Sequence, residues 1–389
     1  MFERTKDLKL SIIKQIELRA SNYPDVISLA QGIPSFDTPP CIKRRVERAL
    51  KRGVVAKYSL SPGLPELREL IELQLANENM YYDFEKEIVV TAGSIQAITA
   101  TILAITKSGD EIIIPEPTYT SYREVITLAG CKPVFAPLNE EKGWSFELDQ
   151  YEKLINEKTK AIFYCNPNNP TGTIYTKEQL LELAKLAKKY NLFLISDEVY
   201  KDFVYDDQKI FSLAEIPEYR NFVIRIYGFS KAYAMTGWRV GYVHSDEKIM
   251  NEIIKVHDSL VTCAPVISQY GAMGALEMGK KDLENFNREY KRRLDLTVNR
   301  LMRLNKVFSF VEPKSSYYVF PRILKNKLTK DDHKINSWDF SLDLLDKCQV
   351  AFVPGFAFGK NGEEHVRISF GRSREDIIKA FNRLDDYFS

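Results

Sequence analysis

Between residues 87 and 243 the chain alternates short apolar segments with segments of helical character, and this alternation limits its possible folds more than any other feature. Seven apolar segments have the length of strands: residues 88–91, 111–114, 133–136, 161–165, 192–196, 222–227 and 240–243. Most are continuous rather than alternating, which is typical of strands buried on both faces. We therefore predict an α/β fold with a mainly parallel, seven-stranded sheet between layers of helices.

Helix signals lie between and after these segments. Thr176 and Gln179 have the spacing of a capping box, and residues 64–79 have the pattern of an amphipathic helix. After about residue 282 the pattern changes to helices at 285–304, 337–348 and 374–387 with short strands at 317–320, 350–353 and 365–370. We predict a large domain at 46–284 and a smaller α+β domain formed by 1–45 and 285–389.

Composition excludes several classes of protein. The chain has 55 basic and 53 acidic residues, a net charge of +2, so no electrostatic argument favours nucleic acid or a membrane surface as a partner. The 44% of hydrophobic residues is typical of a globular protein. The five cysteines and four histidines are scattered, which favours neither a disulfide framework nor a metal site.

Two segments bear on location. The first 17 residues mix charges with apolar residues and show no signal-peptide run, so we expect a cytoplasmic protein. Residues 88–106 carry no charge over a length of 19 residues, close to that of a membrane span. Gly93, Ser94 and several threonines make a buried strand, a glycine turn and a buried helix the better interpretation.

Polar residues follow five of the predicted strands at their carboxyl ends. In open α/β sheets ligands bind at that edge, so the sequence predicts a site there. The residues are Gly93, Ser94, Tyr119, Asn169, Asp197, Tyr200, Ser230 and Lys231.

Lys231 and Asp197 are the residues with the clearest chemical potential. Most lysines are solvated, but Lys231 stands among aromatic, small and glycine residues between two apolar strands. Loss of solvent there favours the neutral, nucleophilic amine that a Schiff base to an aldehyde cofactor needs. Asp197 is either a turn or cap residue or a carboxylate that keeps a pyridine nitrogen protonated.

The remaining candidates have two interpretations each. Asn169 is a turn residue or an amide donor to a ring oxygen, and Tyr200 lies three residues after Asp197. Gly93 and Ser94 open a helix after a strand and so predict an anion site, which Arg239 would complete.

These motifs together resemble the class I aminotransferases of the pyridoxal-phosphate fold type I superfamily. The resemblance covers nearly the whole chain and is greatest to the prokaryotic branch of aspartate, aromatic and kynurenine-type enzymes. It rests on Ser196-Asp-Glu-Val-Tyr200, Asn169-Pro-Thr-Gly172 and the segment from Ser230-Lys231 to Trp238-Arg239.

The resemblance implies a role for each residue. Lys231 would bind pyridoxal 5'-phosphate as a Schiff base and then move a proton, Asp197 would pair with the pyridine nitrogen, and Tyr119 would stack on the ring. Asn169 and Tyr200 would bond its 3'-oxygen. Gly93, Ser94, Ser230 and Arg239 would hold the phosphate. Arg367 would bind the substrate α-carboxylate with Asn169 and the backbone of Gly32, and Tyr58 would reach the phosphate of the second subunit of a homodimer.

Two departures from the family pattern concern the phosphate and the substrate. Gly228 stands where many relatives have a serine, and Ile95 stands where aspartate enzymes often have a lysine for the distal carboxylate. Ile95, with Phe36 and Tyr119 nearby, favours a pocket for aromatic or other apolar side chains, unless Arg372 or Lys360 supplies the cation. The expected reaction is transfer of an amino group from an L-amino acid to a 2-oxo acid such as 2-oxoglutarate.

Other functions remain open at this stage. A β-lyase or related synthase would share the same cofactor site, because the protein selects which bond at Cα breaks. A non-catalytic regulator would carry an added DNA-binding region, and the likeness from about residue 25 leaves little room for one. A nicotinamide dehydrogenase is disfavoured because no GxGxxG follows the first strand.

Overall fold

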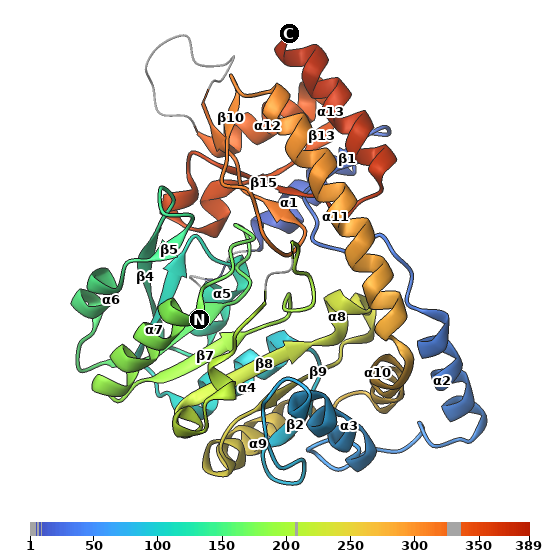
Figure 1. Ribbon diagram of the computed structural model, residues 1–389, viewed down its shortest axis with the longest axis vertical. Coiled ribbons are helices and arrows are strands. Elements are labelled where there is room, and N and C mark those ends of the chain that lie inside the picture. The colour runs from blue at the N-terminus through green and yellow to red at the C-terminus, as the bar shows by residue number, and fades with distance from the viewer. Residues whose placement is uncertain (1–4, 6–7, 9, 207–208, 325–335) are drawn as a thin grey trace.

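A computed structural model describes residues 5, 8, 10–206, 209–324 and 336–389. Its centre is one sheet in the strand order β2-β9-β8-β7-β6-β3-β4-β5, with helices on both faces (Figure 1). The strands are β2 (Ile88–Thr91), β3 (Glu111–Glu116), β4 (Lys132–Asn139), β5 (Ser145–Phe146), β6 (Thr159–Cys165), β7 (Phe193–Asp197), β8 (Val223–Gly228) and β9 (Gly241–His244).

The predicted mainly parallel sheet is confirmed, with one strand more than expected. Pairs β4-β3-β6-β7-β8 are parallel, whereas β9 runs antiparallel to both β8 and β2. The eighth strand, β5, pairs antiparallel with the end of β4. The prediction of seven strands missed it because two residues cannot show a periodicity, and a turn through Gly143 at φ 71° forms the hairpin.

The continuous apolar character of the strands follows from burial on both faces. Along β3, Ile112 and Ile114 belong to one apolar core and Ile113 to the other, as the two-residue period of a strand requires. The covering helices are α3 (Pro65–Ala76), α4 (Ser94–Ile105), α5 (Thr120–Leu128), α6 (Leu148–Leu154), α7 (Lys177–Lys189), α9 (Glu247–Val261) and α10 (Val266–Met278).

Two local predictions are confirmed. Thr176 and Gln179 form the capping box at the start of α7. The uncharged stretch 88–106 is strand β2, a turn at Gly93 and helix α4. Within the described residues, no helix is both long enough and apolar enough to cross a bilayer.

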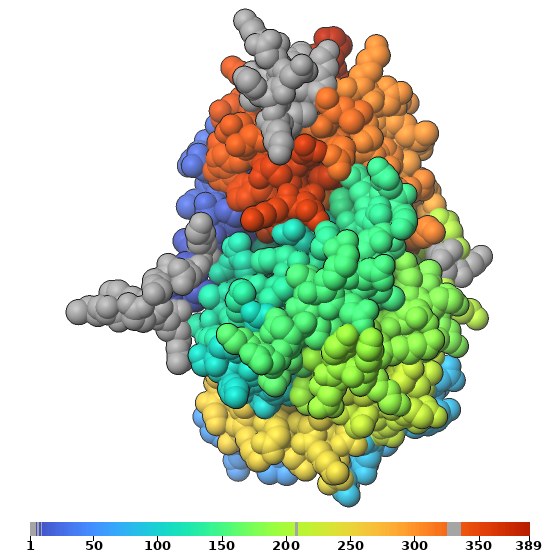
Figure 2. Space-filling view, turned by 90° about the vertical axis from the view of Figure 1, so that its left-hand side faces the viewer, coloured from blue at the N-terminus to red at the C-terminus, as the bar shows by residue number. Residues whose placement is uncertain are grey.

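The C-terminal region packs on top of the sheet region, and the long helix α11 (Lys280–Arg303) runs along one side from one to the other (Figure 1). Figure 2 shows the orange and red surface of this region seated on the green surface of the sheet region. Its elements are β10 (Phe308–Ser309), β11 (Tyr318–Val319), β12 (Arg322–Ile323), α12 (Ser337–Cys348), β13 (Val350–Ala351), β14 (Val353–Pro354), β15 (Val366–Ser369) and α13 (Arg374–Phe388).

The N-terminal segment contacts both regions. It contains α1 (Ile12–Ala20), β1 (Ile27–Ser28) and α2 (Pro40–Lys51). Strand β1 pairs in parallel with β13, whereas α2 packs against α10, where Gly274 permits close approach to the backbone of Ile42. The domain boundaries expected at 45/46 and 284/285 therefore fall inside the continuous helices α2 and α11.

Candidate active site

Lys231 lies directly after β8, in the short helix α8 (Phe229–Ala232). Its Nζ donates a 2.8 Å hydrogen bond to the carbonyl of Gly32, which comes from the distant N-terminal segment. Burial, with the charges of Arg367 and Arg239, lowers the pKa of Lys231 to about 8. About a tenth of the amine is therefore unprotonated at pH 7, and the unprotonated amine is the form that can act as a nucleophile.

Asp197 ends the neighbouring strand β7 and is 3% exposed. One carboxylate oxygen accepts a 2.7 Å hydrogen bond from the hydroxyl of Tyr122, and the other accepts one of 3.2 Å from the N–H of Val199. In the part of the chain that the structure describes, no lysine or arginine forms an ion pair with it. Burial raises the pKa of Asp197 to about 7.

A chain of buried hydrogen bonds joins Asn169, Tyr200 and Arg367. The Asn169 amide donates to the Tyr200 hydroxyl at 3.2 Å, and Arg367 donates to the amide oxygen of Asn169 at 3.1 Å. The Tyr200 and Tyr318 hydroxyls lie 3.1 Å apart. These contacts bring together Asn169, which follows β6, Tyr200, which follows β7, and Arg367 of β15.

The guanidinium of Arg367 is almost fully buried. It lies 4.4 Å above the ring of Tyr318 and donates to the carbonyl of Ala30 at 2.6 Å. Its Nε has no hydrogen-bond partner among the described residues. A buried guanidinium with a free donor fits a carboxylate ligand.

The start of α4 brings together the residues that the sequence predicts as an anion site. Gly93 precedes it at φ 88°, a conformation that favours glycine, and a Cβ there would lie only 2.5 Å from a terminal nitrogen of Arg239. Ser94 begins the helix and packs beside Gly228, and Ser230 is the second residue of α8. A helix N-terminus, a guanidinium and two hydroxyl side chains suit a phosphate group.

Three further predicted residues lie at different distances from this site: Gly32, Tyr119 and Tyr58. A Cβ on Gly32 would lie 1.7 Å from the Tyr318 hydroxyl, so no other residue fits there. Tyr119 precedes α5, and its ring contacts that of Tyr122 edge-on at 5.4 Å. Tyr58 is 84% exposed, and the structure does not bring it into the site of its own chain.

Sequence reasoning missed Tyr122, Tyr318 and Tyr317, and the Arg367 contact with Ala30. Tyr122 lies three residues after Tyr119, which precedes α5, and nothing in that spacing shows that its hydroxyl reaches Asp197. The Tyr317 hydroxyl donates to the carbonyl of Gly32 at 3.0 Å, so that carbonyl faces Lys231 and Tyr317 rather than Arg367.

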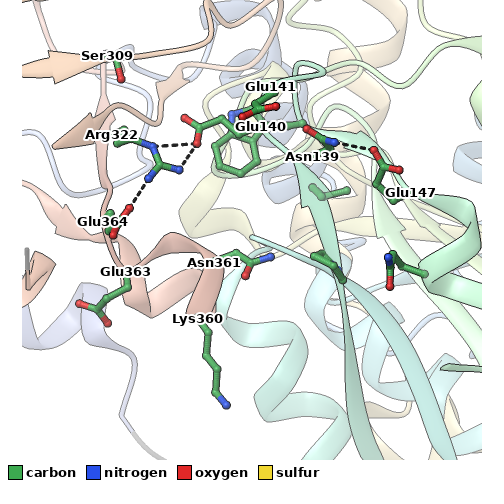
Figure 3. A pocket seen from close by; sticks show the side chains of 14 residues that line it. Asn139, Glu140, Glu141, Glu147, Ser309, Arg322, Lys360, Asn361, Glu363 and Glu364 are labelled. Carbon is green, nitrogen blue, oxygen red and sulfur yellow. Dashed lines mark hydrogen bonds and ion pairs between the residues drawn. The ribbon is translucent and has the colours of Figure 1, made fainter. Parts of the chain in front are cut away.

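A groove of about 1020 Å³ lies elsewhere, between the end of β4 and the C-terminal region (Figure 3). Arg322 bridges Glu140 and Glu364 across it, and the buried His365 contacts Glu140 at 3.1 Å. None of Lys231, Asp197 and Arg367 lines this groove, so it is not the candidate active site. Lys360 lines this groove, with its side chain pointing away from Arg322.

Several proteins to which this chain is similar over its whole length are named as aminotransferases. The chain is 40% identical to an aspartate aminotransferase of Pyrococcus abyssi, over 97% of this chain and 96% of the relative. It is 36% identical to aromatic-amino-acid aminotransferase 2 of Thermococcus litoralis, over 97% and 96%. The crystal structure of an aspartate aminotransferase from Thermotoga maritima covers all of both chains with a TM-score of 0.91 at 33% identity.

The fold is thus that of the fold type I aminotransferases, an α/β class of pyridoxal-phosphate enzymes. Residues 24–384 match the family described as aminotransferase class I and II, and the chain belongs to that family. It is an enzyme, a transaminase, as the resemblance implied. The relatives favour neither the β-lyase nor the regulator interpretation.

Proposed function

We propose that this transaminase moves the amino group of an L-amino acid to a 2-oxo acid such as 2-oxoglutarate, with pyridoxal 5'-phosphate bound covalently at Lys231. The observation that carries the proposal is the partly buried Lys231 amine, whose pKa is lowered to about 8 by desolvation and by the charges of Arg367 and Arg239, against the opposing charge of Asp197. An amine in that state is ready for an aldehyde, and the charges around it match the groups of the cofactor and the substrate.

The residues present fit this cofactor. Asp197 is a buried carboxylate without a cationic partner in the described residues, which suits a protonated pyridine nitrogen. The lack of a side chain at Gly93 lets the Arg239 guanidinium lie against the start of α4, where it could hold a phosphate. Asn169 and Tyr200 offer hydrogen bonds to the 3'-oxygen, and Tyr119 offers a ring face. When bound, the cofactor acts as an electron sink for the bonds at the substrate Cα.

Arg367 and Lys231 act on the substrate itself. The free Nε of Arg367 lets its guanidinium bind the α-carboxylate, while its bonds to Ala30 and Asn169 fix its orientation. With the cofactor bound, the Lys231 amine would be the base that takes the proton from the substrate Cα and the acid that gives it to the cofactor carbon bonded to the amino nitrogen. Its lowered pKa suits a group that both accepts and donates a proton near neutral pH.

We propose a homodimer with shared sites, in which Tyr58 completes the phosphate site of the other subunit. In support, Tyr58 and Leu60 are 84% and 72% exposed, yet hydrogen bonds from Ser61 to Asp258 and from Gln269 to Ser59 hold their loop in place. An ordered loop with exposed apolar side chains suits a subunit contact. Mixing Tyr58→Ala with Lys231→Ala protein should restore part of the activity, and an active monomer would contradict the proposal.

The substrate pocket is expected to accept aromatic or other apolar side chains. Ile95, the second residue of α4, packs half-buried on the apolar core and brings no charge. The two other candidate cations are engaged elsewhere. Arg372 forms an ion pair with Asp376 at 3.7 Å, and Lys360 lines the groove of Figure 3. Phenylalanine, tyrosine, methionine and kynurenine should therefore compete well with aspartate in kcat/KM. A preference for aspartate of about 100-fold, roughly 2.7 kcal/mol, would show that a cation was missed.

The cofactor assignment is tested directly. The purified protein should absorb visible light, borohydride should fix the cofactor to it covalently, and an L-amino acid should change the spectrum. Lys231→Ala should still bind cofactor through the phosphate and ring contacts but should not be fixed by borohydride. Equal fixation in the variant would show that another amine is used. Ammonia in place of a new amino acid among the products would indicate a lyase.

A further inference from the structure

Tyr122 has no role among the cofactor and substrate contacts assigned above, although it touches Asp197 and Tyr119, two of the residues assigned to the cofactor. Its side chain is 2% exposed, comes from α5 and ends at Asp197, to which its hydroxyl donates at 2.7 Å. The ring is held by Phe163, at 4.2 Å between centroids, and by the edge of Tyr119. Packing on both sides fixes the hydroxyl in place.

The other groups that face Asp197 do not donate a side-chain hydrogen bond to it in the described part of the chain. Lys231 on α8 acts on the Asp197 carboxylate through its charge, Glu198 follows it on its own strand, and Cys165 lies opposite it on β6. The Cys165 thiol donates instead to the carbonyl of Pro167 at 3.1 Å, and burial raises its pKa well above the usual value. Within the described part of the chain, Tyr122 is the one side chain that donates a hydrogen bond to the carboxylate.

We propose that Tyr122 is a positioning residue for transamination, whose hydroxyl keeps the Asp197 carboxylate oriented and ionised against the pyridine nitrogen. The proposal rests on the function assigned to Asp197 above. A carboxylate and a pyridine nitrogen that share a proton compete for it, and the stronger base holds it. A hydrogen bond that stabilises the carboxylate makes it the weaker base, so the proton moves to the nitrogen. A protonated ring withdraws electrons from the substrate Cα more strongly.

Tyr122 can keep this role over the whole working pH range. Burial, together with the charge of Asp197, raises the pKa of its hydroxyl well above the usual value, so it remains a neutral donor. A neutral donor stabilises the carboxylate without neutralising it, whereas a cation in the same place would compete with the pyridinium for its charge.

The test uses holoenzyme loaded with pyridoxal phosphate labelled with ¹⁵N in the ring, so that the nitrogen shift reports where the proton lies. In Tyr122→Phe the shift should move toward the unprotonated value, and kcat should fall about 10-fold or more, because hydrogen bonds to charged groups contribute about 10- to 150-fold. KM should change little, and the isotope effect for a substrate deuterated at Cα should rise.

Two further variants make the result decisive. Tyr151→Phe removes another fully buried hydroxyl, one with no hydrogen-bond partner among the described residues, and should leave the shift and kcat unchanged. Replacing Tyr122 with 3-fluorotyrosine, a more acidic donor, should move the shift the opposite way and keeps the test valid should Tyr122→Phe not fold.

The outcomes separate this proposal from the assignment of Asp197. If Tyr122→Phe keeps the wild-type nitrogen shift from pH 6 to 9, about the range in which such groups titrate, the role of Tyr122 is wrong. Asp197→Asn should give an unprotonated nitrogen and weaker cofactor binding. If it gives neither, Asp197 is not the partner of the ring, and the proposed function needs another carboxylate.

Discussion

Asp197 and Glu198 are adjacent carboxylates at the end of β7, both almost fully buried, and the protein treats them in opposite ways. Asp197 receives hydrogen bonds from Tyr122 and Val199 and no ion pair in the described residues. Glu198 forms an ion pair with the fully buried Arg225 of β8 and accepts bonds from Ser196 at 3.0 Å and Ser212 at 2.7 Å. One carboxylate is left for a ligand, and the other is satisfied by the protein.

The difference follows from the two-residue period of a strand, which sends neighbouring side chains to opposite faces of the sheet. The face of Glu198 holds a closed charge cluster. Arg225 reaches Glu78 at 3.5 Å, and Lys201 joins Glu78 at 2.7 Å and Asp202 at 3.1 Å. Burial acts to raise the pKa of Glu78, but the charges of Lys201 and Arg225 outweigh it and lower that pKa. Among the described residues, Glu198 thus belongs to a cluster of ion pairs, whereas its neighbour Asp197 belongs to none.

The largest effect is expected on the ligand face, from Lys231→Ala. Loss of the nucleophile should lower kcat by about 10⁴-fold or more, as for other covalent catalysts. The free energy of unfolding should stay the same or rise, because the variant no longer buries an amine whose pKa burial lowers to about 8. Denaturant unfolding of the cofactor-free protein, measured beside kcat, checks both. A large loss of stability would mean that Lys231 also supports the fold.

Arg225→Met, on the face of the sheet that holds Glu198, should lower the stability of the protein and leave kcat unchanged, which is the opposite of Lys231→Ala. Removal of the guanidinium leaves Glu198 buried without a cation and should cost about 3–5 kcal/mol of stability. The folded fraction should keep its kcat. Adding Glu198→Gln should recover part of the loss, and a double variant no more stable than Arg225→Met would show that packing, rather than charge, explains it.

Asp197→Asn should stabilise the cofactor-free protein, with a pH dependence of defined sign. The pKa of Asp197 is about 7 in the folded protein and about 3.9 in an unfolded chain, so the folded state retains a proton between these values that the unfolded state has lost. Wild-type stability therefore falls as the pH rises from about 4 to 7. Relative to the wild type, the free energy of unfolding of the variant should be unchanged near pH 4 and higher by as much as about 4 kcal/mol at pH 8. A constant difference across this range would contradict a titration of Asp197.

The two faces also differ in how much of them the sequence predicts. The strand ends, α12 at Ser337–Cys348 and the polar residues that follow the strands could be predicted, because polar residues after apolar runs stand out. Gly32 and Arg367 were expected only from the family resemblance. The Glu198–Arg225 pair could not, because a charge inside an apolar run, such as Arg225 in β8, shows its partner only once the strand order is known. Tyr122 and Tyr318 were hidden for a related reason, since an aromatic residue is typical of the core whether or not its hydroxyl bonds to the site.

Ser196→Ala should have the smallest effect and gives the sharpest comparison, because it changes the residue just before Asp197. Ser196 is 1% exposed, and its hydroxyl donates to Glu198 on the side away from the ligand. Glu198 keeps Arg225 and Ser212, so the variant should lose only about 1 kcal/mol, one hydrogen bond's contribution. Its kcat and the visible absorption of its cofactor should match the wild type, because Asp197 keeps both of its donors. Thermal unfolding and steady-state kinetics measure the two parts. A fall in kcat without a fall in stability would mean that the faces communicate through β7, and that the division between a ligand carboxylate and a structural one does not hold.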